Sequence, residues 1–198
     1  MADKETLAVY AERAGDYAKR FGNLGEGPHV TAFLAQIARG GRILDLGCGP
    51  GHTAAAMMRA GYVVDAIDAS PELAAIARDE YGVDVQVTTF DTLQNQEFYD
   101  GIFANFSLLH DPKSEMPNHL SRIARALASH GILHIGLKCG VGERRDALGR
   151  FYAYYEIEEL IGLLTSAGFE SIHQRTGEEI GLDGTVAPWV IILARKRG

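Results

Sequence analysis

Between residues 42 and 137, short apolar segments alternate with amphipathic ones, and this alternation limits the possible folds more than any other feature of the chain. The expected strands are 42–46, 62–67, 84–90, 99–105 and 132–137. The expected helices between them are 51–59, a helix that Ser70 caps, and 116–128. Because strands that alternate with helices form βαβ units, the pattern predicts a Rossmann-like, doubly wound α/β sheet with helices on both faces.

The C-terminal part of the chain completes the predicted sheet. A helix at 156–166 is followed by strands at 171–175 and 189–194. The glycine-containing stretch 176–188 between these strands is too short for a right-handed crossover, so the two strands are expected to be antiparallel. The expected sheet therefore has seven strands and is mostly parallel, with one antiparallel strand near the C-terminus.

Residues 1–40 precede the sheet and are expected to be helical. Apolar residues three and four positions apart predict an amphipathic helix over 4–20, and a second helix is expected at 29–38. The residues expected to separate these helices are Gly22, Gly25, Gly27 and Pro28. Tyr10 and Tyr17 share one face of the first helix, a placement that helix packing explains fully.

Composition restricts the partners of the chain. Its net charge of −7 argues against sequence-independent binding of nucleic acid, which needs a basic face. Two cysteines, Cys48 and Cys139, suggest neither a disulfide framework nor a metal knuckle, and the histidines are too scattered to predict a metal site. No apolar run approaches the roughly 20 residues that cross a bilayer, and the charged N-terminus lacks the apolar core of a signal peptide. We therefore expect a cytoplasmic protein.

A glycine-rich loop, Asp45-Leu-Gly-Cys-Gly-Pro-Gly51, follows the first expected strand. Ligands of doubly wound sheets bind outside the carboxyl ends of the strands, and glycine lets a ligand approach the main chain closely. Such a loop alone is a weak signal, because dinucleotide-binding enzymes have one too. His52, however, stands where the dinucleotide fingerprint requires glycine or alanine.

Two carboxylates near this loop favour a cationic ligand. Asp45 is unfavourable beside a pyrophosphate but suits a ligand with an ammonium and a sulfonium group. Asp68 lies at the tip of the second expected strand, where a carboxylate can accept hydrogen bonds from ribose hydroxyls. A positively charged adenosine derivative without a pyrophosphate, such as S-adenosylmethionine, fits both residues.

The segment Ile43-Leu-Asp-Leu-Gly-Cys-Gly-Pro-Gly51 resembles motif I of the class I S-adenosylmethionine-dependent methyltransferases. Within that superfamily the chain is similar to small-molecule enzymes such as those of ubiquinone and menaquinone biosynthesis and of tellurite resistance. The resemblance extends over about residues 10–169 and is strongest between 42 and 137. It implies transfer of a methyl group to O, N or S of a small-molecule acceptor, with S-adenosylhomocysteine as the product.

The resemblance also implies which residues bind the cofactor. They are Tyr17, Asp45, Gly47, Cys48, Gly49, Asp68, Ala69, Asp91, Thr92, Asn105 and Phe106. In related enzymes the residues that correspond to Asp68 and Ala69 hold the ribose, and an aspartate that resembles Asp91 accepts from the adenine amino group. Asn105 and Phe106 resemble the segment beside the donor methyl group.

The acceptor side is less clearly marked. His110 follows the fourth expected strand and is the candidate general base, although methyl transfer needs no dedicated base when the acceptor loses no proton. The alternative role for His110 is bonding of the loop backbone. Tyr10, Arg144 and Tyr154 are further candidates for acceptor binding, since arginine beside aromatic rings can hold an anionic or planar molecule. A solvated charge and core aromatics explain the latter two equally well.

These features predict a single methyltransferase domain over 1–198. It comprises an N-terminal helical lid (1–40), a cofactor-binding core (41–137), a substrate-side loop (138–155) and a C-terminal helix with strands (156–198). A monomer or a homodimer is expected, without nucleic-acid or membrane partners. Two other functions stay open: a catalytically silent protein that binds S-adenosylmethionine as a sensor or partner subunit, and a nicotinamide-dependent oxidoreductase.

Overall fold

The sheet has the predicted class and strand count. A computed structural model describes residues 3–21 and 27–198 and shows a seven-stranded sheet of order β3-β2-β1-β4-β5-β9-β8. Its strands are β1 (Arg42–Leu46), β2 (Val63–Asp68), β3 (Val85–Val87), β4 (Tyr99–Asn105), β5 (Leu127–Lys138), β8 (Phe169–Ile180) and β9 (Val186–Lys196). Strands β1 to β5 are parallel, whereas β9 is antiparallel to both of its neighbours, β5 and β8. The prediction of one antiparallel strand near the C-terminus is confirmed.

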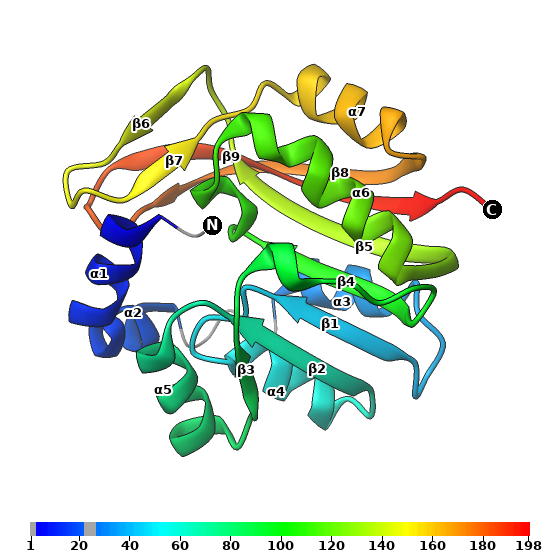
Figure 1. Cartoon of the computed structure of the whole chain (residues 1–198), viewed down its shortest axis with the longest axis horizontal. Coiled ribbons are helices and arrows are strands. Elements are labelled where there is room, and N and C mark those ends of the chain that lie inside the picture. Colours follow the sequence, from blue (N-terminus) through cyan, green and yellow to red (C-terminus); the bar gives the residue numbers. More distant parts are fainter. Residues whose placement is uncertain (1–2, 22–26) are drawn as a thin grey trace.

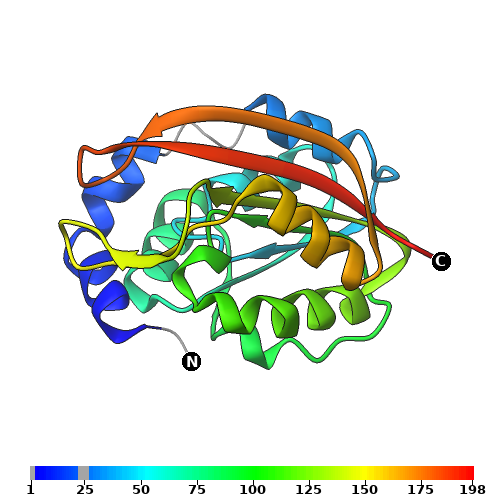
Figure 2. The same cartoon turned by 90° about the horizontal axis from the view of Figure 1, so that it is seen from above.

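Helices cover both faces of this sheet (Figures 1 and 2). They are α3 (Pro28–Leu34), α4 (His52–Arg59), α5 (Pro71–Tyr81), α6 (Met116–Ala126) and α7 (Ile157–Ser166). One apolar core joins α6 and α7 to the sheet, and two smaller cores join α3, α4 and α5 to its other face. As expected, Ser70 caps α5: its hydroxyl oxygen accepts from the amide of Leu73 at 3.2 Å.

The N-terminal segment differs from the single helix expected over 4–20. It forms two helices, α1 (Lys4–Glu12) and α2 (Ala14–Phe21), because Arg13 leaves the helical conformation with ψ at 17°. Gly22 and Gly25, which we expected to end the first helix, lie outside the described residues. Both helices lie at the carboxyl ends of the parallel strands (Figure 1), where the break brings the rings of Tyr10 and Tyr17 to a centroid distance of 5.2 Å.

Three further segments differ from expectation. Strand β3 has three residues rather than seven, and a 3₁₀ turn at Phe90–Thr92 follows it. Strands β8 and β9 are longer than predicted and form a hairpin closed at residues 181–185. The region expected to be a loop contains a second antiparallel hairpin, β6 (Glu143–Arg145) with β7 (Phe151–Ala153). Within the described residues, no helix has the length and apolarity to cross a membrane.

Candidate active site

The loop between β1 and α4 requires glycine for steric reasons. Gly47 has a φ of 78°, and a Cβ added there would lie 2.3 Å from Cβ of Ser107. Ser107 cannot move away easily, because its hydroxyl donates to the carbonyl of Leu46 at 2.6 Å. The amide groups of Gly47 and Cys48 donate to the carbonyl of Ile67, which fixes the loop against the end of β2. The loop backbone is thus held open toward the space above the sheet.

Asp45, near the end of β1, is a buried carboxylate that lacks a complete set of partners. Its side chain is 2% exposed, and its Oδ2 has no hydrogen-bond partner among the described residues. Burial and the nearby charge of Asp68 raise the pKa of Asp45 to about 8. A buried carboxylate of this kind is stabilised by a cation placed against it.

Asp68 ends β2 and is held by the loop backbone. Its Oδ2 accepts from the amide of Gly49 at 2.8 Å, and its Oδ1 accepts from the amide of Ser70 at 2.9 Å. Burial raises the pKa of Asp68, and these amides oppose that effect. Because each carboxylate oxygen has a second acceptor site, the oriented carboxylate can still accept from two hydroxyl groups of a ligand.

Two cavities open above these residues and share part of their walls. The first encloses about 880 Å³ of open space and the second about 720 Å³. The first is lined mainly by Asp45, Pro50, His52, Thr53, Phe103, Leu109, Lys138, Arg150, Tyr152, Glu179, Ile180, Ala187 and Trp189. The second is lined mainly by Thr6, Leu7, Asp68, Ala69, Ser70, Leu73, Thr89, Phe90, Ser107 and Asp111. Both touch Tyr10, Tyr17, Gly47, Gly49, Asn105, Phe106 and His110, so they form one continuous site with two compartments.

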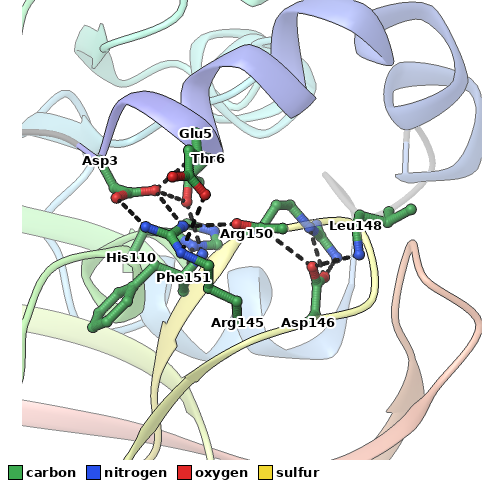
Figure 3. A network of polar contacts seen from close by, with 10 residues as sticks. Asp3, Glu5, Thr6, His110, Arg145, Asp146, Leu148, Arg150 and Phe151 are labelled. Atoms are coloured by element: carbon green, nitrogen blue, oxygen red, sulfur yellow. Dashed lines mark hydrogen bonds and ion pairs between the residues drawn. The ribbon is translucent and has the colours of Figure 1, made fainter.

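Helix α1 and the β6–β7 hairpin are bonded to each other beside these cavities (Figure 3). The guanidinium of Arg145 donates to both carboxylate oxygens of Asp3 at 2.9 Å. The hydroxyl oxygen of Thr6 accepts from the amide of Phe151 at 2.8 Å. These contacts join the first helix of the chain to residues about 140 positions later.

Arg150 is the buried centre of this contact. It is 2% exposed, and its Nε and Nη2 donate to Oδ2 of Asp146 at 2.9 and 2.6 Å. Its Nη1 donates to the hydroxyl of Tyr10 at 3.2 Å. The Oδ1 of Asp146 accepts from the amides of Leu148 and Arg150, which closes the turn of the hairpin.

His110 is held as one tautomer. Its Nδ1 lies 2.7 Å from the carbonyl oxygen of Phe151, which can only accept, so Nδ1 must have the proton. Its Nε2 is then an acceptor for the Tyr10 hydroxyl at 2.9 Å. Burial lowers the pKa of His110 to about 4, so the imidazole is neutral at pH 7.

Most residues predicted from the sequence for the site come together there. Those on the cavity walls are Tyr10, Tyr17, Asp45, Gly47, Cys48, Gly49, Asp68, Ala69, Asn105, Phe106 and His110. Asp91 and Thr92 are outside both walls, and the carboxylate of exposed Asp91 accepts from the hydroxyl of Thr89. Thr89 and Phe90 reach the second cavity in their place.

Arg144 and Tyr154 also lie outside both cavities. The guanidinium of Arg144 lies 3.6 Å from the centroid of the Tyr154 ring, so the two side chains contact each other instead of a ligand. The cation and aromatic ring that this segment contributes to the first cavity are instead Arg150, which immediately precedes β7, and Tyr152 of β7.

Sequence reasoning missed several wall residues. Trp189 is only half-buried and lines the first cavity. Lys138 is the last residue of β5. Its position at the carboxyl end of a strand is the signal that could have identified it as a residue of the site. No comparable signal marks Arg150, Tyr152 and Glu179. These residues reach the cavity only once the β6–β7 and β8–β9 hairpins have formed.

Known proteins resemble this chain in sequence and fold. Residues 43–131 match the family described as "Methyltransferase domain". An uncharacterized methyltransferase of Staphylococcus carnosus is 30% identical over 102 residues, which are 52% of this chain and 49% of that protein. The chain thus spans about half the length of this curated relative.

Two solved structures share the fold. The 1,6-didemethyltoxoflavin-N1-methyltransferase of Burkholderia thailandensis, solved with 1,6-didemethyltoxoflavin and S-adenosylhomocysteine, has a TM-score of 0.79 and 22% identity, covering 98% of this chain and 88% of that chain. An S-adenosylmethionine-dependent methyltransferase of Methanosarcina mazei has a TM-score of 0.75 and 20% identity, covering 86% of this chain and 98% of that chain. The chain therefore contains a match to a methyltransferase domain over residues 43–131 and has the fold of these S-adenosylmethionine-dependent methyltransferases.

Proposed function

We propose that this protein transfers the methyl group of S-adenosylmethionine to a small-molecule acceptor bound in the first cavity. The observation that supports this most directly is the buried carboxylate of Asp45, whose Oδ2 has no partner among the described residues. The cofactor's ammonium group is a cation of the required kind, and the Asp68 carboxylate suits its ribose hydroxyls. The residues present therefore fit the cofactor.

The two compartments together suit the two reactants, with the cofactor extending from Asp68 of the second cavity to Asp45 of the first and the acceptor in the remainder of the first. S-adenosylmethionine supplies a methyl group that is already activated, so the chain needs mainly to align the acceptor and exclude water. Asn105 and Phe106 lie where the compartments meet, and Phe106 adopts the unusual φ of 55° that directs the backbone around this point. Tyr10 of α1, together with Arg150 and Tyr152 of the hairpin segment, lines the first cavity at this part of the site. The neighbour from Burkholderia, which was solved with both 1,6-didemethyltoxoflavin and S-adenosylhomocysteine bound, supports a site for two molecules.

Calorimetry with S-adenosylmethionine, S-adenosylhomocysteine and NAD tests the proposal. We expect both adenosyl compounds to bind and NAD to give no heat, because NAD has no ammonium group to pair with the buried Asp45 carboxylate. Product release across a panel of small acceptors then separates an enzyme from a sensor. Binding of NAD alone would indicate an oxidoreductase, and cofactor binding without product from any acceptor would favour the silent binding protein.

For acceptors that must lose a proton, we propose that His110 is the base and acts through Tyr10. The acceptor proton moves to the Tyr10 hydroxyl oxygen while the proton of that hydroxyl moves to Nε2 of His110, along a hydrogen bond of 2.9 Å between the oxygen and the nitrogen. The imidazolium so formed is stabilised by the Phe151 carbonyl at Nδ1. The Arg150 N–H and the His110 ring use two of the bonding positions of the Tyr10 hydroxyl, which leaves one for the acceptor.

His110→Asn and Tyr10→Phe are expected to lower kcat about 10²-fold or more for acceptors that are protonated at pH 7. For acceptors that are already anionic, kcat should change less than about threefold, because no proton is transferred. Steady-state kinetics with both acceptor classes give the comparison. An equal loss of kcat for both classes would mean that the Tyr10–His110 pair only supports the cavity wall.

The remaining features of the proposal concern the whole protein. We propose a single domain in which 138–155 is the acceptor-side segment, and a cytoplasmic protein that is a monomer or a homodimer. Light scattering of the purified protein measures its oligomeric state.

A further inference from the structure

Lys138 occupies the acceptor end of the first cavity. It is the last residue of β5, where it pairs with Trp189 of β9. Its Nζ lies 4.1 Å from the centroid of the Tyr152 ring. Trp189 and Tyr152 also line the first cavity, so Lys138 shares the wall of that cavity with two aromatic residues.

The ammonium group of Lys138 has no direct counter-ion in the described residues. No carboxylate oxygen of 3–21 or 27–198 lies within 4.0 Å of its Nζ, whereas Arg150, the other cation of this wall, is paired with Asp146. Burial lowers the pKa of Lys138, as does the charge of Arg150, while more distant Asp183 and two other carboxylates oppose this effect. The group is thus a half-buried cation whose contact position for an anion is open.

We infer that Lys138 binds an anionic oxygen of the methyl acceptor and that the substrates of this site are planar molecules with a carboxylate or comparable anionic group. This inference rests on the proposed function, because it assigns the first cavity to the acceptor. The flat body of such a molecule is accommodated by aromatic rings on the walls: Phe106 and Trp189 meet edge to face at 6.4 Å, beside Tyr152.

The negative charge of Glu179 limits how an anionic acceptor can be oriented in the first cavity. Glu179, from β8, lines the same cavity and repels an anion. Asp45, which also lines this cavity, belongs to the part of the site that we assign to the cofactor. An anionic group therefore has one favourable position, at Lys138, and removal of the Glu179 charge should strengthen its binding.

The single tryptophan of the chain, Trp189, reports on this cavity directly. We would titrate benzoate and benzamide, which share a flat ring and differ in charge, into protein saturated with S-adenosylhomocysteine and follow tryptophan fluorescence. Benzoate is expected to bind about tenfold more tightly than benzamide, as a charge-assisted contact gives. Lys138→Met should abolish this preference, Lys138→Arg should retain it, and Glu179→Gln should increase it. Arg78→Met, which removes a charge from the exposed face of α5, should leave it unchanged.

Three outcomes would count against the inference. Equal affinity for benzoate and benzamide, or a preference that survives in Lys138→Met, would overturn it. A tenfold loss of S-adenosylhomocysteine affinity in Lys138→Met would place this residue at the cofactor's carboxylate and overturn it as well. Calorimetry of the wild-type protein with S-adenosylhomocysteine is done first, because absence of that binding overturns the proposed function, whereas normal binding without a benzoate preference overturns this inference alone.

Discussion

Binding of S-adenosylmethionine is expected to release nearly one proton per site between pH 6 and pH 7, and its affinity should rise about tenfold over that interval. In the free protein the pKa of Asp45 is about 8, so its carboxyl group is protonated in this range. The cofactor's ammonium group favours the ionised carboxylate, and the proton must leave when the two pair. Affinity is therefore lost as the pH falls. The cofactor's amino group, with an ordinary pKa of about 7.7–8.0, stays mostly charged below pH 7.

Calorimetry in two buffers of different ionisation enthalpy measures the released proton. The matched variant, Asp45→Asn, should release none and should bind the cofactor at least about thirtyfold more weakly, because a buried charge pair contributes about 2 kcal/mol or more. His52 and His110 do not titrate in this interval, since burial lowers the pKa of each to about 4. A wild-type affinity that is independent of pH between 6 and 7 would contradict the pairing of Asp45 with the ammonium group.

Local sequence signals predicted the elements that position the cofactor residues. Strands β1 and β4 have the predicted bounds, and α5 begins at its predicted cap. A short apolar run marks each of these strands, and a capping residue marks the helix. Such signals lie within a few residues of the element that they specify. The glycine loop and Asp68 follow directly from these bounds, because a carboxyl strand end fixes where its next residues lie.

Features set by contacts between distant segments were not predictable in this way. Strand β3 ends early, at Val87, so the following turn directs Thr89 and Phe90 to the second cavity and leaves Asp91 outside. A displacement of one or two residues was enough to change which side chains line the second cavity. In the same way, only the folded β6–β7 hairpin places Arg150 and Tyr152, and not Arg144 and Tyr154, at the first cavity.

The closed arrangement of the site should depend on the buried ion pair of the β6–β7 hairpin. Replacement of Asp146 by asparagine is expected to lower the free energy of unfolding by about 3–5 kcal/mol, because the guanidinium of Arg150 would stay buried without a counter-charge. The two side chains are 2% and 5% exposed, which leaves little access for water to compensate. Urea denaturation followed by tryptophan fluorescence and circular dichroism measures the change.

The same hairpin offers a matched control. Asp3 and Arg145 also form an arginine–carboxylate pair, but their side chains are 24% and 39% exposed. Asp3→Asn should leave the denaturation midpoint nearly unchanged, since water screens the pair and asparagine still caps α1. The double variant Asp146→Asn/Arg150→Met should recover part of the lost stability, because it removes the uncompensated charge. If Asp146→Asn costs no more than Asp3→Asn, the buried pair does not hold the hairpin.

The effect of Asp146→Asn should also be local. Arg150 donates to Tyr10 as well as to Asp146, so loss of its position loosens both α1 and β7. Amide hydrogen exchange in these two elements is expected to accelerate more than exchange in β1, which the central sheet protects. Acceleration confined to β7 would mean that the Thr6–Phe151 and Asp3–Arg145 contacts are sufficient to keep α1 in place. Acceleration in both elements would identify Arg150 as the link between the helix and the hairpin that together cover the site.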